Sequence, residues 1–177
     1  MINMDTIISD CQQRVKQADD SYTVYGRAML YKERWNDKTV QVPRVYHEGE
    51  YINPLPDDAK GTIVFFQAVG AEKYGQYEVD NIGQINRQVA LTWWGKIENG
   101  LSLENVKFSI IERLQECRYV QAIVSYVDER YQDVFPDFTG YLALADTEQR
   151  TQWLMAPYSG LRLVFNVAYR QERSECL

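Results

Sequence analysis

The chain has 177 residues, 45% of them hydrophobic and 25% charged, which is the composition of an ordinary globular protein. This length favours one domain over two, so we expect residues 1–177 to form a single domain. The formal net charge of −6 argues against a protein that grips nucleic acid, because phosphate contacts need clustered Lys and Arg. DNA could still pass such an acidic surface without binding to it.

The N-terminal segment predicts a helix over residues 5–17. Asp5 is its expected N-cap, because a carboxylate there accepts a hydrogen bond from a free backbone N–H. The apolar residues of its buried stripe recur at helical spacing: Ile7 or Ile8, Cys11 and Val15.

Residues 21–56 predict extended structure. Alternation of side chains over 21–35 favours an extended segment, and 36–38 predict a turn. The strand expected over 39–46 contains Pro43, which places it at the edge of a sheet, because proline has no N–H to donate to a ladder.

The segment from about 40 to 56 is expected to be a projecting hairpin arm. Its tight turn at 47–50 contains Gly49 and is followed by a short return strand. Tyrosine combines an apolar ring with a polar hydroxyl and is enriched in contact surfaces. The candidate interface residues of this arm are Tyr46, His47, Glu50 and Tyr51.

The middle of the chain predicts the centre of the sheet. An apolar, β-rich run over 62–69 is the expected central strand. Residues 70–83 predict a long mobile connection, in which Tyr74 and Tyr77 are further interface candidates. A strand with two apolar faces is expected over 87–97.

The last third of the chain predicts a helix and two strands. Ser102 is the expected cap of a helix that ends near residue 117. Residues 118–127 fit the spacing of either a helix or a strand, and their density of β-branched side chains favours a strand. A turn or short helix is expected around 128–140, and alternation over 161–169 predicts a half-buried strand.

The order of these elements lacks the repeated strand–helix–strand rhythm of a parallel sheet. The simplest packing is an α+β fold with an antiparallel or mixed sheet. We expect two main helices packed on one face of this sheet, together with the extended arm and loops.

Residue types that perform catalysis are scarce. His47 is the single histidine, and as a turn residue or a rim contact it needs no catalytic role. The three cysteines, Cys11, Cys117 and Cys176, form no CxxC pair, so we expect reduced thiols, with the first two in the core. The sequence therefore predicts no catalytic residue, no cofactor and no metal site. We also expect neither a signal peptide, because the N-terminal residues lack a positive start and an apolar run, nor a membrane span, because no apolar run is long enough for one.

One acidic segment deserves comparison with magnesium-dependent nucleases. Residues 56–60, "PDDAK", combine carboxylates with a lysine. Such enzymes hold these groups on adjacent strands and attract phosphate with positive charge, whereas this segment is expected to be a proline-containing loop in an acidic protein. We therefore favour a protein without enzymatic activity.

Several segments, taken in order, resemble a family of phage proteins. They are "YTVYGRAMLYKERWNDKTVQVPRVYHEGEYINPLPDD", "TIVFFQAVGAEKY", "QVALTWWGKI", the capped helix, and "APYSGLRLVFNVAYR". Over roughly residues 20–170 this pattern is similar to head-to-tail connector and ring proteins of tailed bacteriophages, including tail-terminator-like folds, and most of all to those of crAss-like phages.

The resemblance implies a structural virion protein rather than an enzyme. It implies a homo-oligomeric ring, six- or twelve-fold, that is assembled in the host bacterial cytoplasm, stacks with portal, connector or tail proteins and forms part of the DNA channel. It provides no catalytic residues. The alternative that the residues leave open is a small cytoplasmic adaptor or dimer that acts through protein–protein contacts. In either case no membrane partner is expected.

Overall fold

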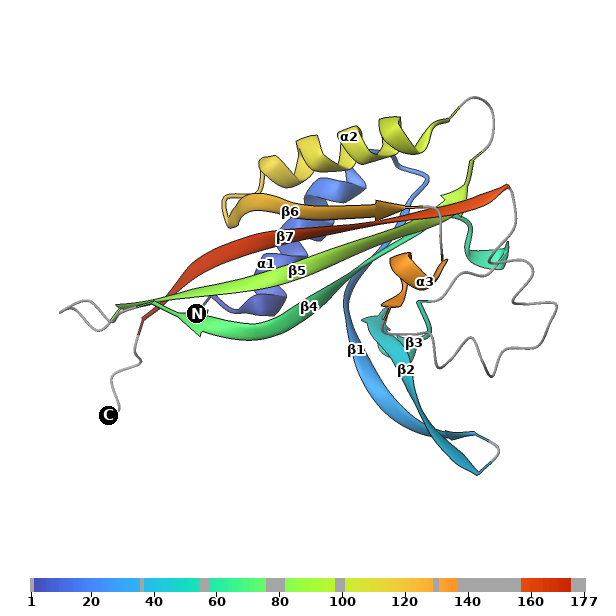
Figure 1. The fold of residues 1–177 in the computed structure, drawn as a ribbon, viewed down its shortest axis with the longest axis horizontal. Helices are drawn as coiled ribbons and strands as arrows, with labels where there is room; N and C mark the ends of the chain where they lie inside the picture. The colour runs from blue at the N-terminus through green and yellow to red at the C-terminus, as the bar shows by residue number, and fades with distance from the viewer. Residues whose placement is uncertain are drawn as a thin grey trace.

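A computed structural model of the chain describes residues 2–35, 37–54, 58–75, 82–97, 101–128, 131–136 and 157–172 (Figure 1). The helices are α1 (Met4–Lys16), α2 (Leu103–Gln115) and α3 (Tyr131–Val134), with a short 3-10 helix η1 (Asp58–Lys60). The strands are β1 (Thr23–Trp35), β2 (Lys38–His47), β3 (Glu50–Ile52), β4 (Ile63–Tyr74), β5 (Ile82–Lys96), β6 (Val120–Asp128) and β7 (Tyr158–Glu172). None of the helices in these ranges is long and apolar enough to cross a membrane.

The strands form one mixed sheet in the order β3-β2-β1-β4-β5-β7-β6. All neighbours are antiparallel except β1 and β4, which run parallel. The α+β fold class expected from the sequence is therefore confirmed. The predicted central strand at 62–69 is also confirmed, because β4 is the fourth strand of the sheet and its residues 63–66 are fully buried.

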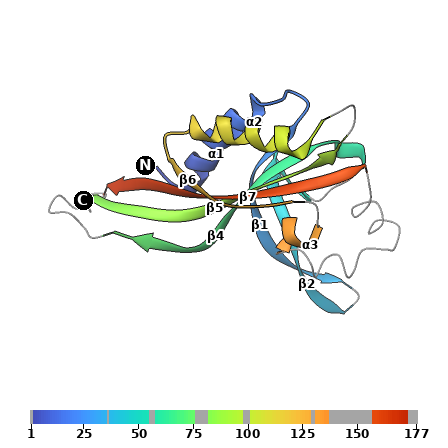
Figure 2. The same ribbon diagram turned by 45° about the horizontal axis from the view of Figure 1, so that its top comes forward.

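Helices α1 and α2 cover one face of the sheet, as Figure 2 shows. The larger hydrophobic core lies beneath them. It contains Ile7, Cys11 and Val15 from α1, Val106, Ile110 and Leu114 from α2, and the inward-facing residues of β4, β5 and β7, including Phe66, Trp93, Leu163 and Phe165. Alternate residues of the predicted strand at 161–169 are buried here, as their period of two requires.

A second, smaller core lies on the opposite face of the sheet. Phe65 and Trp94 both pack against Phe135, at ring-centroid distances of 5.9 and 5.5 Å. Val134 in α3 and Tyr25 in β1 complete its centre. Because β4 and β5 contribute large apolar residues to both cores, each reads as apolar on both faces of the strand.

The two main helices begin at side-chain caps. The predicted cap of α2 is confirmed, because Ser102 Oγ accepts a hydrogen bond from the backbone N–H of Asn105 at 3.2 Å. The predicted cap of α1 is wrong. Asn3 accepts the hydrogen bond of the Thr6 N–H at 2.9 Å, and Asp5 lies inside the first turn, where it pairs with Arg27 on β1 at 3.2 Å.

Two expectations about the middle and end of the chain have opposite outcomes. The choice of a strand over 118–127 is confirmed by β6. The long connection expected over 70–83 is wrong at both ends, because β4 continues to Tyr74, β5 begins at Ile82 and the Gly75 N–H donates to Gln84 O at 2.9 Å. Its middle, residues 76–81, lies outside the described residues. These ends of β4 and β5 extend beyond the helices (Figure 1).

The hairpin that projects from the body is not the one predicted over residues 40–56. Residues 38–47 and 50–52 do form a hairpin, and β3 covers β2 from Val45 to His47 alone. The part that projects from the body, however, is the β1–β2 hairpin, which ends in a turn at Asp37 with φ 62° (Figure 1). Beyond Ala28, strand β1 no longer pairs with β4. Both faces of this outer part of β1 therefore lie outside the two cores.

Candidate interaction surfaces

Three tyrosines gather on the face of the β1–β2–β3 sheet end. Tyr46 and Tyr51 are directly opposite each other on β2 and β3, with ring centroids 5.2 Å apart, and the Tyr31 ring lies 5.5 Å from that of Tyr51. Tyr46 and Tyr51 are 61% and 55% exposed although each contacts another ring. A hydrogen bond with Tyr51 raises the pKa of the Tyr31 phenol. We call Tyr31, Tyr46 and Tyr51 the tyrosine cluster.

The tyrosine cluster includes two of the predicted interface residues and excludes two others. His47 lies on the opposite face of the hairpin, because its ring packs edge-on against the buried Tyr25 at 5.1 Å. Its Nε2 lies 3.7 Å from a carboxylate oxygen of the exposed Glu48. Glu50 is exposed directly across from His47 in the β2–β3 ladder. His47 therefore anchors the turn to the body, and this contact gives it a structural role.

An ion pair joins the two strands of the β1–β2 hairpin beside the tyrosine cluster. Arg44 on β2 contacts the Glu33 carboxylate on β1 through both Nε, at 2.9 Å, and a terminal guanidinium nitrogen. Such two-point contacts fix a planar guanidinium more firmly than one hydrogen bond does. The Arg44–Glu33 pair lies on the same face of the β1–β2 hairpin as Tyr31 and Tyr46.

The remaining predicted interface residues belong to the far end of the β4–β5 hairpin. Tyr74 is exposed, and its hydroxyl donates to Glu72 at 2.8 Å. Glu72 also binds Arg87 on β5 at 2.9 Å. The hydrogen bond from Tyr74 lowers the pKa of Glu72, and the nearby Arg87 guanidinium lowers it further. Tyr77 lies outside the described residues.

A second apolar surface lies at the other end of the sheet and was not predicted. Strand β6 is the last strand, and its residues 120–127 contain no charged residue and no proline. Val124 is 48% exposed on β6, and Phe108 is 62% exposed on the outer face of α2. The Lys107 ammonium lies over the rings of both Phe108 and Tyr126, at 4.9 and 4.6 Å, and so joins helix and strand. We call Phe108 and Val124 the β6–α2 surface; Val127 lies across from Arg162 on β7 and so faces away from the helices.

The geometry of β6 favours packing of side chains over continuation of the sheet. Its pairing with β7 shifts register between Val120 and Ala122 and again between Ile123 and Ser125. Such bulges bend an edge strand and hinder a partner strand from pairing along its whole length. Val124 is left out of the regular ladder. A partner would therefore contact the exposed side chains of the β6–α2 surface.

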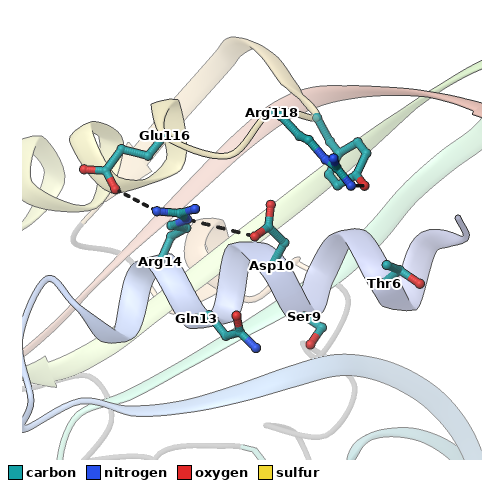
Figure 3. A pocket seen from close by; sticks show the side chains of 8 residues that line it. Thr6, Ser9, Asp10, Gln13, Arg14, Glu116 and Arg118 are labelled. Carbon is teal, nitrogen blue, oxygen red and sulfur yellow. Dashed lines mark hydrogen bonds and ion pairs between the residues drawn. The ribbon is translucent and has the colours of Figure 1, made fainter.

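A groove lies between α1 and the end of α2 (Figure 3). Its volume is about 580 Å³, and its lining includes Thr6, Ser9, Asp10, Arg14, Glu116 and Arg118. Arg14 bridges the two elements, because it lies 3.9 Å from Asp10 and 3.4 Å from Glu116. Below the groove, the buried sulfur atoms of Cys11 and Cys117 are 3.5 Å apart, and the Cys117 thiol donates to Asp10 Oδ2 at 3.1 Å.

The segment compared with nucleases has no described carboxylate cluster. Residues 58–60 form η1, and Lys60 Nζ donates to the backbone carbonyl of Asn53 at 2.6 Å. Residues 55–57 lie outside the described ranges. Within those ranges, no group of three or more His, Cys, Asp or Glu side chains is arranged to hold a metal ion.

No protein-family model matches the chain, and no curated protein matches it. The two surfaces and their placement in the sheet are therefore the features that bear on function. The sequence indicated two members of the tyrosine cluster, because Tyr46 and Tyr51 flank a predicted turn. The signal for the β6–α2 surface was the uncharged run "VQAIVSYV", which could not be placed at a sheet edge without knowing the strand order.

Proposed function

We propose that this protein is a structural subunit of a homo-oligomeric ring in the head-to-tail connector of a tailed bacteriophage, where it forms part of the channel for DNA. The supporting observation is the presence of two unlike apolar surfaces at opposite ends of one sheet. A subunit that contacts its neighbour through two different surfaces assembles head to tail, and such contacts close into a ring when the rotation between subunits permits.

The composition of the two surfaces suits contacts between copies of this chain. The tyrosine cluster offers aromatic rings with hydroxyl groups, and aromatic residues are enriched at interfaces. The β6–α2 surface offers Phe108 and Val124, which a solitary chain would leave in water. The tyrosine cluster lies at the end of the sheet where β3 is the last strand, and Tyr46 and Tyr51 are exposed there to a neighbour. The net charge of −6 is compatible with DNA that passes through a ring without binding.

Two variants that each block one surface provide the test. Val124→Lys places a charge on the β6–α2 surface, and Tyr51→Lys places one in the tyrosine cluster. Each variant alone should fail to assemble. Mixed together, they should form a one-to-one heterodimer, because the intact tyrosine cluster of one variant meets the intact β6–α2 surface of the other. Gln17→Lys, an exposed change at the end of α1, is the matched control and should assemble like the unmodified chain.

The same experiment separates a ring from the alternative, a small adaptor or dimer. A symmetric dimer formed through β6 would lose assembly with Val124→Lys and keep it with Tyr51→Lys, and mixing would rescue nothing. Native mass spectrometry distinguishes these patterns, because the two variants differ in mass. Formation of the heterodimer supports the head-to-tail contact, and its absence together with assembled Tyr51→Lys contradicts it.

A further inference from the structure

Two cysteines that are 106 positions apart in the chain meet between the two main helices. Cys11 lies in the middle of α1, and Cys117 follows the C-terminal end of α2. Their sulfur atoms are 3.5 Å apart, and both residues are buried. A disulfide has a sulfur–sulfur bond of about 2.05 Å, so the two atoms need to approach by only about 1.5 Å.

The environment of the pair differs from that of two ordinary core cysteines. Asp10, on the same helix as Cys11, accepts a hydrogen bond from the Cys117 thiol at 3.1 Å and also lines the groove between α1 and the end of α2. The thiol of Cys117 is therefore connected to the groove through the side chain of Asp10, which lines it (Figure 3). The hydrogen bond from Cys11 lowers the pKa of Cys117, and the same contact together with burial raises the pKa of Cys11. The two thiols are thus unequal, as in a pair with one attacking and one resolving sulfur.

We propose that Cys11 and Cys117 form an oxidisable dithiol that hydrogen peroxide converts into an intramolecular disulfide between α1 and the end of α2. This inference does not depend on the proposed function. The sulfur of Cys117 attacks one peroxide oxygen, the O–O bond breaks, and the thiol proton passes through the Asp10 carboxylate to the leaving hydroxide, which departs as water. The product is a sulfenic acid at Cys117.

The second step uses the neighbouring thiol. The sulfur of Cys11 attacks the sulfur of the sulfenic acid, the S–O bond breaks, and the hydroxyl group leaves as water with the thiol proton of Cys11. Two thiols and one peroxide thus yield one disulfide and two waters. The short separation of the two sulfurs favours this step over further oxidation at Cys117.

The cross-link would join segments that enclose the larger core. Both cysteines belong to that core, together with Ile7, Val15 and Leu114. A disulfide that closes a loop of this length strongly restricts the unfolded chain. The chain would fold with free thiols in a reducing compartment and become resistant to unfolding after transfer to an oxidising one, where disulfides persist.

The test uses the full chain with Cys176→Ser, so that only the pair can react. After treatment with hydrogen peroxide, denaturation and thiol labelling, both cysteines should be protected, and the intact mass should decrease by two hydrogen atoms. The melting temperature should rise by about 10 °C, and dithiothreitol should reverse the rise. Peptide mapping should recover Cys11 joined to Cys117.

Single substitutions provide the controls. Cys11→Ser and Cys117→Ser, each in the Cys176→Ser background, should gain no thermal stability from peroxide. The proposal is contradicted if both thiols remain available for labelling after a treatment that oxidises the unfolded chain completely. It is equally contradicted if peroxide lowers the melting temperature, or if the product is a cross-linked dimer on a non-reducing gel.

Discussion

Tyr46 and Tyr51 face each other across the ladder between β2 and β3, with ring centroids 5.2 Å apart and ring planes inclined at 62°. Strand β3 is only three residues long, so the contact between these two rings is a large part of its side-chain packing against β2. Both rings nevertheless keep more than half of their surface in contact with solvent. The pair is thus available to a partner without rearrangement of the hairpin.

Replacement of Tyr46 by Ser should weaken assembly much more than stability. The exposed ring makes one cross-strand contact, so its loss should lower the free energy of unfolding by less than about 1 kcal/mol. Chemical denaturation measures that cost, and light scattering over a range of concentrations measures assembly. A large loss of stability with unchanged assembly would show that the ring is a structural element of the hairpin and no contact residue.

Phe65→Ala should destabilise the protein strongly. Phe65 is fully buried on β4 and packs against Phe135, so the substitution removes apolar contacts and leaves a cavity, at a cost of about 3–5 kcal/mol. Phe108→Ala is the matched control, because Phe108 is 62% exposed and should lose far less. Equal destabilisation of the two variants, measured by urea denaturation, would contradict the burial of β4.

Gly160→Ala should be destabilising for a different reason. A Cβ atom at Gly160 would lie 2.6 Å from Cζ3 of Trp94 and 3.1 Å from Cγ1 of Val134, so the buried indole would have to shift. We expect a cost of about 1–3 kcal/mol from this overpacking. Gly26→Ala, where the nearest atom is Gln12 Oε1 at 3.6 Å, should cost little. A difference in melting temperature between the two alanine variants checks this prediction.

Glu72→Gln should lower stability in a way that depends on pH. The hydrogen bond from Tyr74 and the ion pair with Arg87 lower the pKa of Glu72 below its ordinary 4.5 in the folded protein. The ionised carboxylate therefore stabilises the fold at pH values above 4.5, and this contribution is lost as the pH falls through the lowered folded-state pKa. At pH 7 the variant should be less stable by about 1 kcal/mol, and the difference should vanish in acid. A difference that grows in acid would contradict this account.

The parts of the fold that sequence predicts well are those with a clear local period. The helical spacing of Cys11 and Val15 and the alternation of Leu161, Leu163 and Phe165 each describe one buried face, and both elements form as predicted. Pro43 is consistent with the open part of β2, because β3 covers that strand only from Val45 onward. These features depend on neighbours in the chain, so the sequence alone is sufficient.

The parts that sequence does not predict depend on contacts between distant residues. The polar stretch around Glu72 looks like a loop, yet it is held in the ladder by Arg87 on the next strand. The parallel pairing of β1 with β4, the position of β6 at the sheet edge and the meeting of Cys11 with Cys117 all depend on the order of strands. No local pattern contains that order, so the β6–α2 surface and the dithiol become visible only in three dimensions.

The central claim is that this chain acts by binding copies of itself through two unlike ends of one sheet. The most direct measurement is the mass and symmetry of the purified unmodified protein, by native mass spectrometry and electron microscopy of single particles. The account predicts closed rings of one defined copy number, six- or twelve-fold. A monomer at every concentration tested would contradict it.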